Sequence, residues 1–163
     1  MIIRYAEKGD IAEINKLLYQ VHKIHADARP DLFVQNEKKY SDKELAEMIA
    51  DKRHNPIFVA ELHGEVVGYA FCQVIRNSVN SRKINTLYID DLCVEEKERG
   101  NHVGSKLFDY VTSYAKKEGF YNVTLNVWEL NASAKLFYEK KGMTIQKYGM
   151  EKKRANFLSI ISL

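Results

Sequence analysis

Residues 86–105 constrain the fold of this chain more than any other stretch. An apolar run over residues 87–94 leads through a charged corner into RGNHVGS, residues 99–105, and an apolar-periodic segment follows at once. This order is typical of a strand, a loop and a helix. The first backbone N–H groups of a helix have no partner within it, and the helix dipole adds positive charge there. The stretch therefore predicts either a phosphate or diphosphate site or an ordinary connector.

Four elements are expected ahead of this stretch. They are a strand at residues 2–5, a helix from residue 11 that ends before residue 30, a short helix after residue 41, and a hairpin over residues 57–71. Asp10 is a candidate N-cap of the first helix, and Ser41 with Glu44 has the form of a capping box. His63-Gly64 supplies the turn of the hairpin.

Four more elements are expected after residue 102. They are a helix that stops at Gly119, a strand at residues 121–128, a helix capped by Asn131 that ends at Gly142, and a strand at residues 143–148. Residues 1–163 contain no repeat or linker, so they are predicted to form one mixed α/β domain with a single sheet and helices on both sides.

Composition excludes several classes of protein. The formal net charge of +3 is too small for the concentrated basic stripe of a nucleic-acid-binding protein, and residues 152–154 are interpreted as a solvated basic strand end. The sequence has no apolar run of about 18 residues and no signal-peptide pattern at its start, so we expect a cytoplasmic protein without a membrane partner.

No metal site is expected from the cysteines and histidines. Cys72 and Cys93 lie inside apolar runs without ligand spacing, which favours buried small hydrophobic residues. His22 and His25 are three residues apart, and no fourth ligand is in view.

Two motifs resemble signatures of the GNAT superfamily of acetyl-CoA-dependent N-acetyltransferases. Arg99-Gly100-Asn101-His102-Val103-Gly104 is similar to the family's diphosphate loop, which reads Arg or Gln, two residues, Gly, one residue, Gly or Ala; His102 stands at the first Gly. Residues 131–143, NASAKLFYEKKGM, are similar to Asn-x-x-Ala-x-x-Phe-Tyr-x-x-x-Gly-Phe, with Met in place of the last Phe. Residues 88–94 and 99–107 also resemble small-amine acetyltransferases of the spermidine/spermine type.

The resemblance covers nearly the whole chain and implies a fold. A single GNAT-like α/β domain is expected, with a mixed, mostly antiparallel central sheet of about six or seven strands flanked by about four helices. The resemblance also places the acceptor pocket on the first two helices. His22, His25 and the RPDLF loop, residues 29–33, would line that pocket, or the histidines would face solvent at the helix end.

The resemblance implies contacts with acetyl-CoA as well. Backbone groups of Leu92, Cys93 and Val94 would meet the pantetheine arm, and an amide of this strand would polarise the thioester oxygen. Asn131 would contact the arm near the second helix. The remaining contacts are N–H groups to the diphosphate, from Arg99, Gly100, Asn101, His102, Val103, Gly104 and Ser105. The Ser105 hydroxyl either adds a contact to a phosphate or is an ordinary first-turn serine.

The chemistry needs a group that removes the ammonium proton, donors for the oxyanion and a proton for the thiolate. The resemblance places the base at Asp90, acting directly or through water. Asp90 and Asp91 are adjacent, so on a regular strand they point to opposite faces and one of them looks into a cleft. Their alternative role is as solvated or structural carboxylates. The resemblance assigns the acid to Tyr138, with core packing as the alternative.

These expectations define a function. The sequence predicts an N-acetyltransferase that transfers an acetyl group from acetyl-CoA to a primary amine of a small molecule or a protein, by direct attack in a ternary complex. The alternative is a non-catalytic acyl-CoA-binding or sensing module. The apolar tail, residues 155–163, could pair as an edge strand or pack on a second subunit, which would make a homodimer.

Overall fold

The computed structural model describes residues 1–35, 37, 39–76 and 82–153 of the 163. The chain divides into two compact units, Met1–Asn126 and Val127–Leu163. Within the described ranges, no helix is both long enough and apolar enough to cross a membrane. The apolar tail and the end of the basic run, residues 154–163, lie outside the described residues, so the predicted edge strand or dimer contact there stays a prediction.

The first unit is built on a five-stranded sheet in the order β1-β2-β3-β4-β5. The strands are β1 (Ile2–Tyr5), β2 (Ile57–Leu62), β3 (Glu65–Arg76), β4 (Asn85–Val94) and β5 (Asn122–Leu125). Neighbouring strands are antiparallel except β4 and β5, which are parallel. The mixed, mostly antiparallel sheet is thus confirmed.

The expected count of six or seven strands is wrong for the described residues, which form five. The strand predicted at residues 143–148 is absent, because residues 143–153 adopt neither helix nor strand. Ile145 and Tyr148 are exposed there, and a strand needs a hydrogen-bonded neighbour that the local sequence pattern does not supply.

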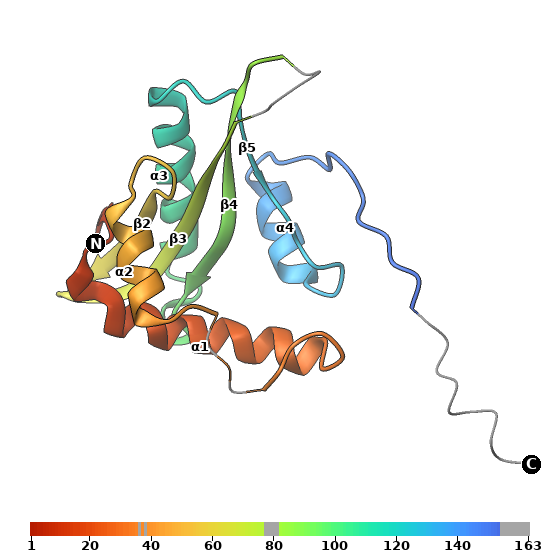
Figure 1. Ribbon diagram of the computed structural model, residues 1–163, viewed down its shortest axis with the longest axis horizontal. Coiled ribbons are helices and arrows are strands. Elements are labelled where there is room, and N and C mark those ends of the chain that lie inside the picture. The colour runs from red at the N-terminus through yellow and green to blue at the C-terminus, as the bar shows by residue number, and fades with distance from the viewer. Residues whose placement is uncertain (36, 38, 77–81, 154–163) are drawn as a thin grey trace, which may run out of the picture. The chain divides into compact units, whose positions relative to one another are not determined.

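Helices cover both faces of this sheet (Figure 1). One face carries α1 (Ile11–Ala28) and α2 (Asp42–Ala50), and the other carries α3 (Val103–Lys117). The α1 face buries a core that includes Ile14, Leu45 and Tyr69. On the α3 face, Phe58 packs its ring against the rings of Tyr110 and Tyr114, with centroids 5.1 and 5.0 Å apart.

Local sequence signals account for several boundaries. The Ser41 hydroxyl accepts a hydrogen bond from the backbone N–H of Glu44, and the Glu44 carboxylate accepts one from the Ser41 N–H, so the capping box is confirmed. His63 and Gly64 both have positive φ, 53° and 85°, as the two-residue turn between β2 and β3 requires.

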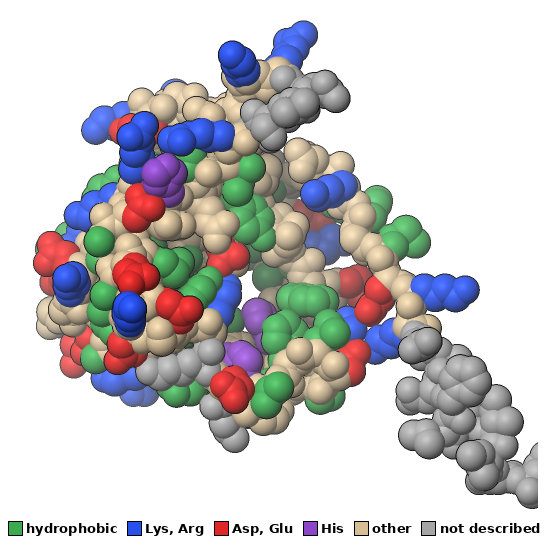
Figure 2. Space-filling view, in the orientation of Figure 1, with side chains coloured by type: hydrophobic (Ala, Val, Ile, Leu, Met, Phe, Trp, Pro, Cys, Tyr) green, Lys and Arg blue, Asp and Glu red, His purple; other side chains and the backbone are tan. Residues whose placement is uncertain are grey.

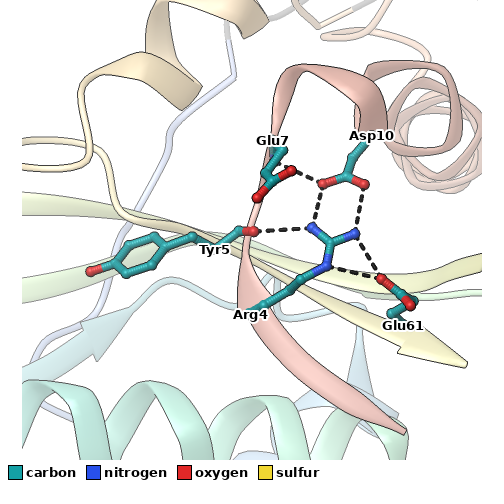
Figure 3. A network of polar contacts seen from close by, with 5 residues as sticks. All are labelled: Arg4, Tyr5, Glu7, Asp10 and Glu61. Carbon is teal, nitrogen blue, oxygen red and sulfur yellow. Dashed lines mark hydrogen bonds and ion pairs between the residues drawn. The ribbon is translucent and has the colours of Figure 1, made fainter. Parts of the chain in front are cut away.

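Asp10 lies at the start of α1, but its side chain does not cap that helix. Its carboxylate instead takes two hydrogen bonds from Arg4, of 2.8 and 2.9 Å, and one from the N–H of Glu7 (Figure 3). Arg4 also pairs with Glu61 on β2. The network therefore joins β1, β2 and the short 3₁₀ turn Lys8–Asp10 in front of α1.

Gly68 allows α3 to approach β3 closely. A Cβ at this position would lie 2.9 Å from the Cys93 carbonyl oxygen and 3.1 Å from Cδ1 of Leu107. A larger residue would therefore push apart β3, the end of β4 and the first turns of α3.

The second unit contains one helix in its described part, α4 (Ala132–Lys140). Asn131 caps it as predicted, because its side-chain oxygen accepts a 3.1 Å hydrogen bond from the N–H of Ala134. Gly142, with φ of 83°, follows the helix end as expected.

Candidate active site

The open edge of β4 is the first feature of the site. Pairing between β4 and β5 ends at Ile89 and Leu125. Beyond that point Asp91–Val94 pairs with β3 on one side, while no described strand pairs with it on the other. Gln20 binds the Val94 carbonyl oxygen, and the other backbone groups on that edge have no strand partner among the described residues. An extended ligand can add to a sheet at such an edge, as a strand-like arm does.

A β-bulge lies at the start of this edge. Phe71 pairs with Asp91 and Cys72 pairs with Ile89, so Asp90 is the extra residue that the ladder skips. A bulge re-aims the side chains next to it. Asp90 and Asp91 therefore need not alternate between faces as they would on a regular strand.

The bulge directs Asp90 to a lysine and a tyrosine from the loop before α2. Asp90 Oδ2 accepts hydrogen bonds from Nζ of Lys39, at 2.8 Å, and from the hydroxyl of Tyr40, at 3.0 Å. The Tyr40 ring stacks on Phe71, with centroids 5.9 Å apart and an interplanar angle of 12°. The Asp90 side chain is 21% exposed, so it remains reachable.

Asp91 is bound by the same aromatic cluster. Its Oδ2 accepts a 2.7 Å hydrogen bond from the hydroxyl of Tyr69, whose ring packs edge-on against Phe71. Asp90 thus bonds to Tyr40 and Asp91 to Tyr69, and both of these rings pack on Phe71. The expectation that the two carboxylates point to opposite faces of the sheet is therefore wrong. Loss of water around Asp91 raises its pKa, although the Tyr69 hydrogen bond and the charges of Lys39 and His25 oppose the rise.

The end of α1 and the loop after it form an aromatic wall. The Phe33 ring lies 6.1 Å from that of His22 and 5.5 Å from that of His25. Nε2 of His22 lies 2.6 Å from the carbonyl oxygen of Val34, which can only accept, so this nitrogen donates. Burial lowers the pKa of His25, and the charge of Asp91 partly opposes the change. The histidines therefore pack on the predicted loop rather than facing solvent freely.

Backbone conformation in the diphosphate-type loop supports an anion site. Gly100 and His102 both adopt left-handed conformations, with φ of 86° and 60°. His102 precedes α3 as its N-cap residue, and its side chain makes no capping hydrogen bond. The N–H groups of Val103, Gly104 and Ser105 therefore begin the helix without side-chain capping from His102, as an anion-binding helix start requires. His102 therefore has the positive φ that glycine adopts most readily.

Gln20 on α1 links that helix to the end of β4. Its side-chain Nε2 donates a 3.1 Å hydrogen bond to the carbonyl oxygen of Val94, and its Oε1 accepts one of 3.2 Å from the N–H of Glu96. Cys93 points into the α1 core, where its sulfur lies 3.8 Å from the carbonyl oxygen of Leu17. Burial raises the pKa of Cys93 to about 12, so its thiol is a packed hydrophobic group, as predicted.

The second unit holds the remaining predicted residues. Tyr138 lies on α4 beside Phe137, with ring centroids 5.0 Å apart, and Asn131 caps the same helix. Their assigned roles rest on the motif at residues 131–143. Among the residues that the structure describes, no group of three or more His, Cys, Asp or Glu side chains is arranged to hold a metal ion.

The sheet, the open β4 edge and the loop before α3 define a class of protein. The family model of the acetyltransferase (GNAT) family matches residues 18–143. The chain therefore belongs to the GNAT family and is a GNAT-type acetyltransferase domain.

Two curated relatives support this assignment. An uncharacterized N-acetyltransferase of Methanocaldococcus jannaschii is 26% identical over 140 residues, which are 86% of this chain and 59% of that protein. A glucosamine 6-phosphate N-acetyltransferase of Arabidopsis thaliana is 32% identical over 65 residues, which are 40% of this chain and 42% of that protein. The matches thus span about half the length of these two relatives.

Solved structures share the fold along most of the chain. A point mutant of the BH1408 protein from Bacillus halodurans has a TM-score of 0.89 and 30% identity, and the match covers 94% of this chain and 99% of that one. A possible acetyltransferase from Clostridium difficile 630 has a TM-score of 0.74 and 23% identity, covering 94% and 97%. The second likeness shows the fold alone.

Sequence reasoning missed several residues that contact the Asp90 and Asp91 carboxylates or the end of β4. They are Gln20, Lys39, Tyr40 and Tyr69. Gln20, Lys39 and Tyr40 reach β4 from more than 45 positions away along the chain, and no short motif marks them. For Tyr69 one signal existed, because the period of two along β3 places it on the same face as Phe71.

Proposed function

We propose that the chain transfers an acetyl group from acetyl-CoA to a primary amine, by direct attack within a ternary complex. The observation that carries this proposal is the position of Asp90, a reachable carboxylate at the first residue of the open β4 edge. A carboxylate at that point can take a proton from an amine that approaches from the α1 side.

The cosubstrate fits the residues that are present. The open edge offers backbone groups to an extended pantetheine arm, and Leu92, Cys93 and Val94 are the residues proposed to meet that arm. The left-handed loop and the start of α3 supply N–H groups between Arg99 and Ser105 for the diphosphate. Acetyl-CoA contributes the activated acetyl group as a thioester.

The reaction proceeds in one displacement. The amine nitrogen bonds to the acetyl carbonyl carbon while the bond from that carbon to sulfur breaks. Asp90 accepts the ammonium proton, directly or through water, and passes it to solvent. A β4 amide stabilises the oxyanion, and Tyr138 is the proposed donor of a proton to the CoA thiolate. The nitrogen loses its second proton as the amide forms, and that proton replaces the one that Tyr138 gave.

Asp91 is a second carboxylate in the same cluster. Burial raises its pKa, and its Oδ2 accepts the hydrogen bond of the buried Tyr69 hydroxyl within the aromatic cluster. We therefore assign Asp91 to holding the bulge and the aromatic cluster in place.

The proposal is tested by release of free CoA thiol from acetyl-CoA in the presence of separate amines. The panel contains polyamines, amino acids, aminoglycosides, and peptides with free N-termini or lysines. Turnover with one class would support the enzyme and identify its substrate group. Binding of acetyl-CoA without turnover on any class would favour the alternative, a sensing module.

A further inference from the structure

Lys39 places a primary amine of the chain itself on the proposed base. Its Nζ lies 2.8 Å from Oδ2 of Asp90, at the start of the open β4 edge. We propose that Lys39 is an intramolecular acceptor, so that the chain acetylates its own Lys39 when it binds acetyl-CoA. This inference rests on the proposed function, because the same donor and the same base would serve both reactions.

The contacts around Lys39 hold the amine at this position. Tyr40, the next residue, donates to the same Asp90 oxygen and stacks on Phe71 of β3. Nζ of Lys39 also lies 5.3 Å from the centroid of the Tyr40 ring, within the range of a cation–π contact. The amine is thus held by the Asp90 carboxylate on β4 and by the Tyr40 ring, which packs on Phe71 of β3.

The step balances without any further reactant. A bond forms between Nζ of Lys39 and the acetyl carbon, and the carbon–sulfur bond of the thioester breaks. The lysine ammonium loses two protons: one passes through Asp90 to solvent, and one goes to the CoA thiolate. The products are acetyl-lysine, free CoA thiol and a solvent proton.

Protonation makes the reaction slow at neutral pH. Burial lowers the pKa of Lys39, but the hydrogen bond and charge of Asp90 outweigh it and hold the pKa above its ordinary value. The attacking form is the neutral amine, so self-acetylation should accelerate as the pH rises.

Lys23 provides a matched control within the same chain. Its Nζ lies 2.7 Å from Oδ2 of Asp27, an ion pair like that of Lys39 with Asp90. The Lys23 side chain is 74% exposed and that of Lys39 is 39% exposed, so uncatalysed acetylation by free acetyl-CoA should favour Lys23. Asp27 lies on α1 and not on β4.

The experiment incubates the full chain with acetyl-CoA alone and follows the acetylation of each lysine by peptide mass mapping. We expect Lys39 to be modified at least about tenfold faster than Lys23, against the order of exposure, because a positioned base assists one of them. The first-order rate at Lys39 should not change on about tenfold dilution of the protein, since the acceptor is intramolecular. Lys39→Arg, which retains a cation for Asp90, should lose this modification.

Asp90→Asn separates assisted from uncatalysed acetylation by the sign of its effect. Without Asp90 the pKa of Lys39 falls and more neutral amine is present, so uncatalysed acetylation would accelerate. With Asp90 as the base, the variant should instead slow Lys39 acetylation by at least about tenfold and leave the rate at Lys23 unchanged.

Each outcome decides between the two claims. If CoA is released with an external amine while Lys39 is modified no faster than Lys23, self-acetylation is overturned and the proposed function stands. If neither reaction occurs although acetyl-CoA binds, both are overturned. A rate at Lys39 that rises with protein concentration would contradict an intramolecular acceptor.

Discussion

The hydroxyl of Tyr69 donates a 2.7 Å hydrogen bond to Oδ2 of Asp91, and the Tyr69 ring is fully buried. This bond joins β3 to β4 next to the bulge at Asp90. The bond holds the Asp91 carboxylate in place. Because Tyr69 and Tyr40 both pack on Phe71, it also stabilises the surroundings of Asp90.

Tyr69→Phe should lower the free energy of unfolding by about 2 kcal/mol at neutral pH, because it removes a hydrogen bond to a charged group. Asp91 has a folded-state pKa above its unfolded value, and the stability linked to its protonated form is lost as the pH rises through that folded pKa. The variant raises the folded pKa of Asp91 further, so the stability lost in Tyr69→Phe should grow as the pH rises through the wild-type folded pKa, which lies above about 4.

Urea denaturation between acid and neutral pH measures this effect. The control repeats Tyr69→Phe in a chain that also carries Asp91→Asn, where the pH dependence should vanish. If Tyr69→Phe cost the same at every pH in the chain that retains Asp91, the hydrogen bond would not act on the charge of Asp91.

Asp10→Ala should cost about 3 kcal/mol of stability at neutral pH, because Arg4 loses a largely buried partner. Burial raises the pKa of Asp10, but the hydrogen bonds from Arg4 and from the N–H of Glu7 outweigh it and hold the pKa below its ordinary value. The stability that Asp10 contributes is therefore full above about pH 4 and is lost as the pH falls through the folded pKa.

Thermal unfolding between pH 2 and pH 7 should show the gap between wild type and Asp10→Ala closing on the acid side of about pH 4. Glu61→Gln is the matched control, because Glu61 is the second carboxylate on the same guanidinium and is more exposed. It should cost about 1 kcal/mol or less. Equal losses of stability in Asp10→Ala and Glu61→Gln would contradict the larger contribution assigned to Asp10.

Gly68→Ala should destabilise the first unit by about 1–3 kcal/mol, because its Cβ would overlap the Cys93 carbonyl oxygen. The same change should weaken acetyl-CoA binding, since it displaces the end of β4 and the start of α3 together. Gly9→Ala is the control: its Cβ meets nothing within 4 Å, and its effect should be small. Denaturation and acetyl-CoA titration of both variants give the comparison. An unchanged acetyl-CoA affinity in Gly68→Ala would show that binding does not depend on the position of α3.

Tyr138→Phe should lower kcat by about a hundredfold, the range of a lost general acid, while the KM for acetyl-CoA changes little. The phenol is the proposed donor to the thiolate, and the ring that remains preserves packing beside Phe137. Steady-state kinetics with the best amine of the panel tests the assignment. A kcat equal to that of wild type would show that Tyr138 only packs beside Phe137 and is not the acid.

Local chemistry made some of this structure predictable. The Ser41 capping box and the His63-Gly64 turn involve residues a few positions apart, so their patterns are complete in the sequence. The helix after His102 and the cap at Asn131 were predicted on the same basis.

Features that depend on distant partners were not predictable in this way. The bulge at Asp90 exists because β3 and β4 shift register between Phe71 and Cys72, and neither strand alone records that shift. Asp10 was predicted as a cap, but the guanidinium of Arg4 competes for its carboxylate. The strand expected at residues 143–148 failed because its alternating pattern does not determine whether a neighbouring strand pairs with it.

The most direct test of the account is the pH dependence of turnover in wild type and in Asp90→Asn, with Asp91→Asn as the neighbouring control. We predict that the wild-type rate rises with pH, and that Asp90→Asn is slower by about a hundredfold near neutral pH with a flattened rise. Asp91→Asn should retain the shape of the wild-type profile. An unchanged profile in Asp90→Asn would contradict the role of Asp90 as the base.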